Sequence, residues 1–132
     1  MGDAMLDKKA IAMINAKNFA FVATISKDGS PQLTPTWVDT DGKRIIINTA
    51  MGRAKQRNTA RDARVAVVVP DSQNMYSYLY VKGRVIEQRQ EGASEHIDKL
   101  AKKYMGKDTY PWKDPKETRV MLIIEPEKVI SQ

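Results

Sequence analysis

Two Asp-Gly pairs divide the first half of the sequence into short β-forming segments. Residues 19–25 are rich in β-formers and end at the turn 27–30, residues 32–39 return, and a second turn at 40–43 leads into residues 44–48. An Asp-Gly pair between such segments is typical of a tight hairpin, because glycine readily adopts the positive φ that the turn requires. The first half is therefore predicted to form three antiparallel strands in a meander.

The second half is predicted to add three more strands, at residues 64–69, 75–87 and 119–125. Short helices are expected around residues 6–17, 52–60 and 94–104. Six mainly antiparallel strands with short flanking helices indicate a mainly β (α+β) chain, folded as a small Greek-key or split β-barrel. The length of 132 residues suits one domain spanning 1–132.

Three residues carry expectations of their own. Pro35 cannot donate a backbone hydrogen bond, so its strand is expected to lie at a sheet edge or to bend away there. Gly83 is expected to mark a bulge or a close approach by another group. His96 falls off the apolar stripe of its helix and is expected to be a solvated surface residue.

The composition excludes several kinds of site. The chain has no cysteine and one histidine, which excludes disulfides, thiolate metal sites and cysteine nucleophiles, and disfavours a multi-histidine metal site. If the chain is an enzyme, a cofactor is expected to supply the chemistry. No apolar run approaches the roughly 20 residues of a membrane span and the first residues lack a signal pattern, so a cytoplasmic protein is expected.

Cations cluster where the strand of residues 44–48 gives way to a helix. Arg53, Arg57 and Arg61 are spaced i, i+4, i+8, so on a helix they share one face and repel one another. An anion bound among them would offset that repulsion, and the helix N-terminus beside Lys55 would attract it further. A solvated basic helix explains the spacing about as well. A nucleic-acid surface, suggested by the net charge of +6, is the weakest interpretation, and no nucleic-acid partner is predicted.

Several stretches resemble one known family. They are residues 21–32 (FVATISKDGSPQ), 34–39 (TPTWVD), 48–58 (NTAMGRAKQRN), 61–65 (RDARV), 83–85 (GRV), 95–104 (EHIDKLAKKY) and 110–111 (YP). Together they look like the pyridoxamine 5'-phosphate oxidase-like superfamily of FMN-binding split barrels, and in particular its branch that uses the deazaflavin coenzyme F-420. The resemblance covers nearly the whole chain, and its most specific part is the segment from Gly52 to Asn58.

The resemblance implies a six-stranded antiparallel split β-barrel that forms a homodimer, with two cofactor sites at the subunit interface. It implies an oxidoreductase that transfers hydride between reduced coenzyme F-420 and an unsaturated small-molecule substrate. Along the ring system it places Gln32, Thr34, Pro35, Thr36 and Trp37. Near the ring edge and ribityl chain it places Asn48, Thr49 and Ala50, and near the phosphate Arg53, Ala54, Lys55, Arg57 and Asn58. Closure of the site by aromatic residues of the partner subunit is assigned to Tyr76 and Tyr78, with Trp112 as a further candidate.

Two alternatives to this function stay open. One is an FMN-binding protein of the same fold, since FMN also presents a ring, a ribityl chain and a phosphate. The other is a carrier module that binds a cofactor without turnover. The basic net charge favours the deazaflavin, because that cofactor carries an acidic oligoglutamate tail.

Overall fold

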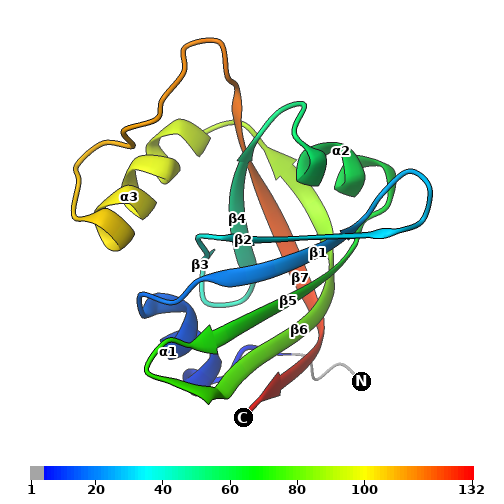
Figure 1. The fold of residues 1–132 in the computed structure, drawn as a ribbon, viewed down its shortest axis with the longest axis vertical. Helices are drawn as coiled ribbons and strands as arrows, with labels where there is room; N and C mark the ends of the chain where they lie inside the picture. Colours follow the sequence, from blue (N-terminus) through cyan, green and yellow to red (C-terminus); the bar gives the residue numbers. More distant parts are fainter. Residues whose placement is uncertain (1–4) are drawn as a thin grey trace.

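A computed structural model describes residues 5–132 and arranges them around one twisted antiparallel sheet (Figure 1). The helices are α1 (Lys8–Asn15), α2 (Ala54–Arg61) and α3 (Ala93–Met105). The strands are β1 (Ala20–Ile25), β2 (Pro31–Thr36), β3 (Asp39–Thr40), β4 (Ile45–Ala50), β5 (Arg64–Asp71), β6 (Asn74–Arg89) and β7 (Arg119–Ser131). No helix among residues 5–132 is long and apolar enough to cross a membrane.

The mainly antiparallel split-barrel fold is confirmed, but the predicted number of strands is wrong. The sheet has seven strands in the order β2-β1-β5-β6-β7-β4-β3. The seventh arises because the predicted strand 32–39 is divided: β2 pairs with β1, whereas Asp39 and Thr40 pair with β4. Residues 37–38 therefore connect the two edges of the sheet, and this is where the barrel is split.

The local expectations for turns and for Pro35 are confirmed. Gly29 has φ 88° in the turn between β1 and β2, and Gly42 has φ 97° in the turn before β4. In the first of these turns the Asp28 carboxylate accepts from the backbone N–H of Ser30 at 3.0 Å. Pro35 lies in β2, an edge strand that pairs only with β1, where a residue without a backbone N–H is tolerated.

The core lies on the inner face of the sheet. Alternate residues of β1, β5 and β6 are buried there, as the two-residue period of a strand requires. Helix α1 covers one end of this core with Ala10, Met13 and Ile14. The largest fully buried side chains include Ile14, Ile45, Ile47, Leu79, Leu122 and Ile124.

The two other helices lie on either side of β4 (Figure 1). Helix α2 begins four residues after β4 ends. Helix α3 carries a buried apolar stripe of Ile97, Leu100 and Tyr104. A long loop, residues 106–118, returns from α3 to β7. This arrangement leaves a hollow between α2, α3, the loop and the strands that end there.

Candidate functional site

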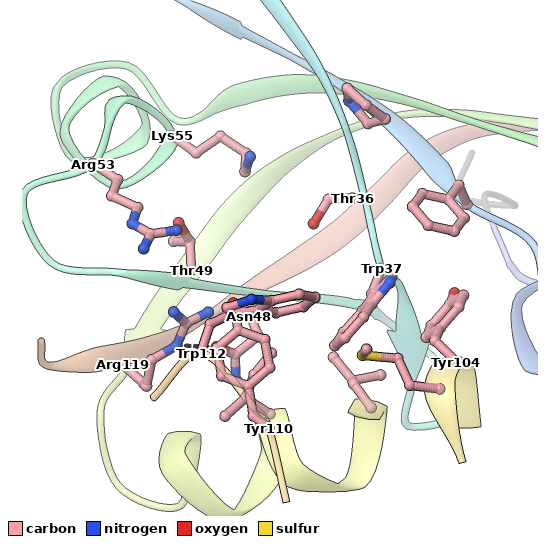
Figure 2. A pocket seen from close by; sticks show the side chains of 15 residues that line it. Thr36, Trp37, Asn48, Thr49, Arg53, Lys55, Tyr104, Tyr110, Trp112 and Arg119 are labelled. Atoms are coloured by element: carbon pink, nitrogen blue, oxygen red, sulfur yellow. Dashed lines mark hydrogen bonds between the residues drawn. The ribbon is translucent and has the colours of Figure 1, made fainter. Parts of the chain in front are cut away.

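A cavity of about 510 Å³ occupies that hollow (Figure 2). It is open to solvent, and its walls come from β2, β4, α2, α3, the loop 106–118 and the first residue of β7. The lining residues are Phe19, Pro35, Thr36, Trp37, Asn48, Thr49, Arg53, Lys55, Ile97, Leu100, Tyr104, Met105, Tyr110, Trp112 and Arg119. Positive charge and aromatic rings are both present in this set.

One wall, at the start of α2, carries the cations Arg53 and Lys55, while the third cation of the cavity, Arg119, lies over the ring of Tyr110, 5.4 Å from its centroid. Lys55 is half-buried, and its Nζ donates to Thr34 Oγ1 at 2.9 Å. Burial, and after it the charge of Arg53, lowers the pKa of Lys55. Arg53 and Arg119 both pair with Glu117, Arg119 at 3.1 Å. A half-buried cation that is destabilised by a neighbouring cation would be stabilised by a bound anion.

The start of α2 adds to this positive wall. Its N-cap residue is Arg53, whose side chain makes no capping hydrogen bond. Just before it, the N–H of Gly52 donates to Gln56 Oε1 at 2.8 Å, and Gly52 has φ 88°. The positive end of the helix dipole is therefore directed to the same region as the side-chain cations, which suits a phosphate or carboxylate.

The opposite wall is aromatic. Trp37 stacks on Tyr104 with ring centroids 5.2 Å apart and planes only 4° from parallel. Tyr110 meets Trp37 edge-on at 5.9 Å and Trp112 edge-on at 5.5 Å. Figure 2 shows this cluster across the cavity from Arg53 and Lys55. A wall of this kind suits a flat ring system.

Tyr104 contributes its ring to this wall, while its hydroxyl is engaged elsewhere. The hydroxyl donates to the carbonyl of Asn18 at 2.5 Å and accepts from the N–H of Val38 at 3.2 Å. Burial raises the pKa of Tyr104 to about 12. The tyrosine therefore stays protonated at neutral pH and fixes the connection between β2 and β3 against α3.

A chain of hydrogen bonds runs beneath the cavity. Arg119 Nε donates to Asn48 Oδ1 at 2.9 Å, and Asn48 Nδ2 contacts His96 Nδ1 at 3.0 Å. His96 Nε2 lies 2.9 Å from Asp39 Oδ2. The side chain of His96 is only 9% exposed, so the expectation of a solvated surface residue is wrong. The reason is non-local: β3 brings Asp39 under α3, and the sequence period of α3 contains no information about that contact.

Asp39 gives this region a testable pH dependence. Burial alone would raise its pKa, but hydrogen bonds from His96 and the N–H of Thr40, with the charge of Lys99, lower the pKa to about 2 from its ordinary value of 3.8. A carboxylate whose pKa falls on folding stabilises the native state above its unfolded pKa. That stability is lost as the pH falls through the folded pKa.

Wild-type protein is thus expected to lose on the order of 2 kcal/mol of unfolding free energy through Asp39 between about pH 4 and about pH 2. The Asp39→Asn variant should lack this part of the acid loss, as measured by urea unfolding at stepped pH. Asp108→Asn, at a side chain that is 90% exposed, is the control. An Asp39→Asn profile parallel to that of the wild type over this range would contradict the assignment.

The structure gathers about half of the predicted site residues at the cavity. Those that line it are Pro35, Thr36, Trp37, Asn48, Thr49, Arg53 and Lys55, and Thr34 contacts Lys55. Gln32, Ala50, Ala54, Arg57, Asn58, Tyr76 and Tyr78 are not among the lining residues.

Three of these absent residues have clear positions of their own. Arg57 is exposed on α2, and Asn58 is buried, donating to Thr24 Oγ1 at 3.0 Å. Tyr76 is 93% exposed near the start of β6. None of the three contacts the cavity within the described part of the chain.

Sequence reasoning missed most of the aromatic and apolar wall. The residues it did not assign to the site are Phe19, Ile97, Leu100, Tyr104, Met105, Tyr110 and Arg119. The stripe on α3 has the spacing of an ordinary core helix, and nothing in that spacing shows that one part of it borders a cavity. Arg119 is the first residue of an apolar strand, so its sequence context does not indicate a site. Only its hydrogen bond to Asn48, 71 residues away, shows that it lies at the cavity.

Comparison with known proteins agrees with this geometry. A family model described as pyridoxamine 5'-phosphate oxidase matches residues 6–132. A solved F-420 reductase is 27% identical, with a TM-score of 0.80 over 92% of this chain and 95% of that chain. A candidate pyridoxamine 5'-phosphate oxidase from Listeria innocua is 18% identical, with a TM-score of 0.72 over 93% of this chain and 94% of that chain. HupZ from Group A Streptococcus is 23% identical, with a TM-score of 0.70 over 96% of this chain and 94% of that chain. The last two likenesses concern the fold alone.

Proposed function

The chain belongs to the pyridoxamine 5'-phosphate oxidase family, and on this premise we propose that it is an oxidoreductase whose cavity binds coenzyme F-420. It would transfer hydride between the reduced cofactor and an unsaturated organic substrate. The observation that carries the proposal is the pairing of a cationic wall with an aromatic wall across one cavity of about 510 Å³. A cofactor made of a flat ring and a phosphate needs both walls. The likeness to an F-420 reductase favours the deazaflavin over FMN.

The residues present fit such a group. The ion pairs of the described residues leave Lys55 without a carboxylate partner, although its pKa is lowered by burial and by Arg53. Lys55 and Arg53, at the start of α2, would bind the phosphate. Trp37 would lie against the ring, and Asn48 and Thr49 would contact its polar edge.

This placement gives the cofactor and the side chains of the protein separate roles. The bound cofactor would supply the hydride chemistry, so the chain requires no nucleophilic side chain or metal for the step. Arg119 lies at the cavity and would stabilise negative charge that develops near the ring. Trp112 and Tyr110, on the loop 106–118, would exclude water from one side.

We further propose that the chain acts as a homodimer. The outer face of the sheet carries several exposed apolar residues, among them Phe21, Leu33 and Ile130, which are 39%, 65% and 38% exposed. Phe21 and Leu33 belong to the neighbouring strands β1 and β2, so their side chains lie near one another. A second copy of the chain would cover this face. Dimerisation would also let Tyr76 or Tyr78 of the second copy approach the cavity of the first. Sedimentation velocity would show whether the protein is a dimer.

A cofactor titration tests the central proposal. Coenzyme F-420, oxidised or reduced, is expected to quench the fluorescence of Trp37 and Trp112, which line the cavity, with a dissociation constant in the micromolar range, and FMN is expected to bind more weakly. Activity would then be measured with the reduced cofactor against a panel of enones and quinones. Tight FMN binding with no response to F-420 would replace the deazaflavin by the flavin. Binding without turnover of any panel member would support a carrier.

A further inference from the structure

Four side chains from four different elements form the hydrogen-bonded chain beneath the cavity. Asp39 belongs to β3, Asn48 to β4, His96 to α3 and Arg119 to β7. Of the four, Asn48 and Arg119 line the cavity, as Figure 2 shows, whereas Asp39 and His96 are not among its lining residues. His96 therefore has no direct route to a bound ligand and can act only through Asn48.

The partners of Asn48 determine which way its amide points. Arg119 Nε can only donate, so the Asn48 atom that faces it is the oxygen Oδ1. The amide nitrogen then faces the carbonyl of Ala93 at 2.9 Å and His96 Nδ1 at 3.0 Å. The opposite orientation would place the amide nitrogen against Arg119 Nε, which is a donor facing a donor. Only the observed orientation avoids this.

The same reasoning fixes the tautomer of His96. Because the Asn48 amide nitrogen only donates, His96 Nδ1 must be an acceptor and carries no proton. The proton of the neutral ring is therefore on Nε2, which donates to Asp39 Oδ2 at 2.9 Å. Asp39 also accepts from Lys99 Nζ at 3.2 Å and from the N–H of Thr40 at 2.8 Å, so it stays in place as an anion.

We propose that His96 is a positioning residue of this cavity. In its neutral Nε2–H form it holds the amide of Asn48, and Asn48 in turn holds Arg119 at the edge of the cavity. Only one part of this inference rests on the function proposed above, namely the identity of the ligand that Arg119 contacts. The positioning itself is a property of the protein without ligand.

Protonation of His96 would break this arrangement. A second proton on Nδ1 would face the amide N–H of Asn48, so the amide would turn away and its Oδ1 would leave Arg119. The charged groups that face this chain are Asp39 on β3, Lys99 and Lys103 on α3, Arg119 on β7, and Glu117, which pairs with Arg119 from the loop 106–118. Affinity for an anionic ligand should therefore be lower in the form of the protein that carries a second proton on His96.

The first test reads the ring itself. The chain has one histidine, so in protein free of any affinity tag the imidazole nitrogens give one set of NMR signals. In the neutral ring we expect the proton on Nε2 and not on Nδ1, together with an Arg119 Nε–H signal protected from solvent exchange. A neutral ring with its proton on Nδ1 would overturn the proposal. These signals need no cofactor, so they decide the positioning even if the protein binds neither F-420 nor FMN.

The second test uses three variants. His96→Phe keeps the ring volume but removes both hydrogen-bonding atoms, and should abolish protection of the Arg119 Nε–H and weaken binding of F-420, or of FMN, about tenfold. His96→Asn places an amide oxygen near the former Nδ1 and should restore part of that loss. Lys102→Met, on the same helix, removes a cation that pairs with Asp108 and contacts none of the four side chains, and should leave both readouts unchanged.

The outcomes separate positioning from simple support of the fold. A general loss of stability would affect His96→Phe and His96→Asn alike. Positioning predicts that His96→Asn recovers both the Arg119 Nε–H protection and the affinity, and that His96→Phe recovers neither. Unchanged Arg119 Nε–H protection in a folded His96→Phe protein would refute it.

Discussion

Replacing Lys55 with methionine is expected to weaken cofactor binding by about 1.5–3 kcal/mol, the range for a hydrogen bond to a charged group. Methionine keeps most of the side-chain length but removes the ammonium that lies half-buried at the cavity. The loss should appear in the affinity measured by fluorescence titration with F-420 or FMN. It should appear little in stability, because the charge of Lys55 is itself disfavoured by burial and by Arg53.

The matched control is Arg57→Met on the same helix. The family resemblance places Lys55 and Arg57 together near the phosphate, so the sequence predicts no difference between them. The structure separates them, since Lys55 lines the cavity and Arg57 is exposed outside it. Arg57→Met is therefore expected to change affinity by less than about 0.5 kcal/mol. Equal losses in the two variants, or no loss in either, would mean that the anion binds elsewhere.

The spacing of the three arginines on α2 illustrates the limits of a pattern argument. The spacing of Arg53, Arg57 and Arg61 predicted one shared face, either holding an anion or solvated as a plain basic helix. In the structure Arg53 is the N-cap residue and pairs with Glu117, while Arg61 donates to the carbonyl of Ile25 and to Asn58 Oδ1, both at 2.9 Å. Only the first of the three reaches the cavity, because the helix has just eight residues and its two ends meet different neighbours.

Local features of the fold were predictable because their causes are local. Asp-Gly turns, the apolar run of β5 and the edge position of Pro35 depend on a few adjacent residues, and each was found as expected. The division of the predicted strand 32–39 into β2 and β3 was not predictable in this way. It depends on pairing with two partners at opposite edges of the sheet.

The cationic wall of the cavity was predictable from the sequence, whereas of the aromatic wall only Trp37 and Trp112 were named in advance, for a related reason. Arg53 and Lys55 follow directly from the strand-to-helix junction that also carries the family resemblance. The aromatic wall is assembled from residues far apart in the chain, such as Trp37 and Tyr104, which stack across 67 positions. The aromatic residues were visible in the composition, but only the tertiary fold brings their rings together.

Replacing Gly83 with alanine should lower the free energy of unfolding by about 3 kcal/mol, the upper part of the range for overpacking a buried site. Gly83 is buried in β6, at a shift in register with β7. A Cβ there would lie 2.3 Å from the backbone oxygen of Glu125 and 3.2 Å from Ile124 Cγ2. A backbone atom of a paired strand cannot move aside as the end of a flexible side chain can, so β6 and β7 would have to separate locally.

Urea unfolding followed by circular dichroism would measure this loss, and the neighbouring Lys82→Ala is the control. Lys82 is exposed on the same strand, so its truncation should change the unfolding free energy by less than about 0.5 kcal/mol. Gly83 does not line the cavity between α2 and α3, so the fraction of Gly83→Ala that stays folded should bind cofactor with wild-type affinity. A Gly83→Ala protein as stable as the wild type would show that β7 can shift away from β6, and the close approach would then not be what requires glycine at this position.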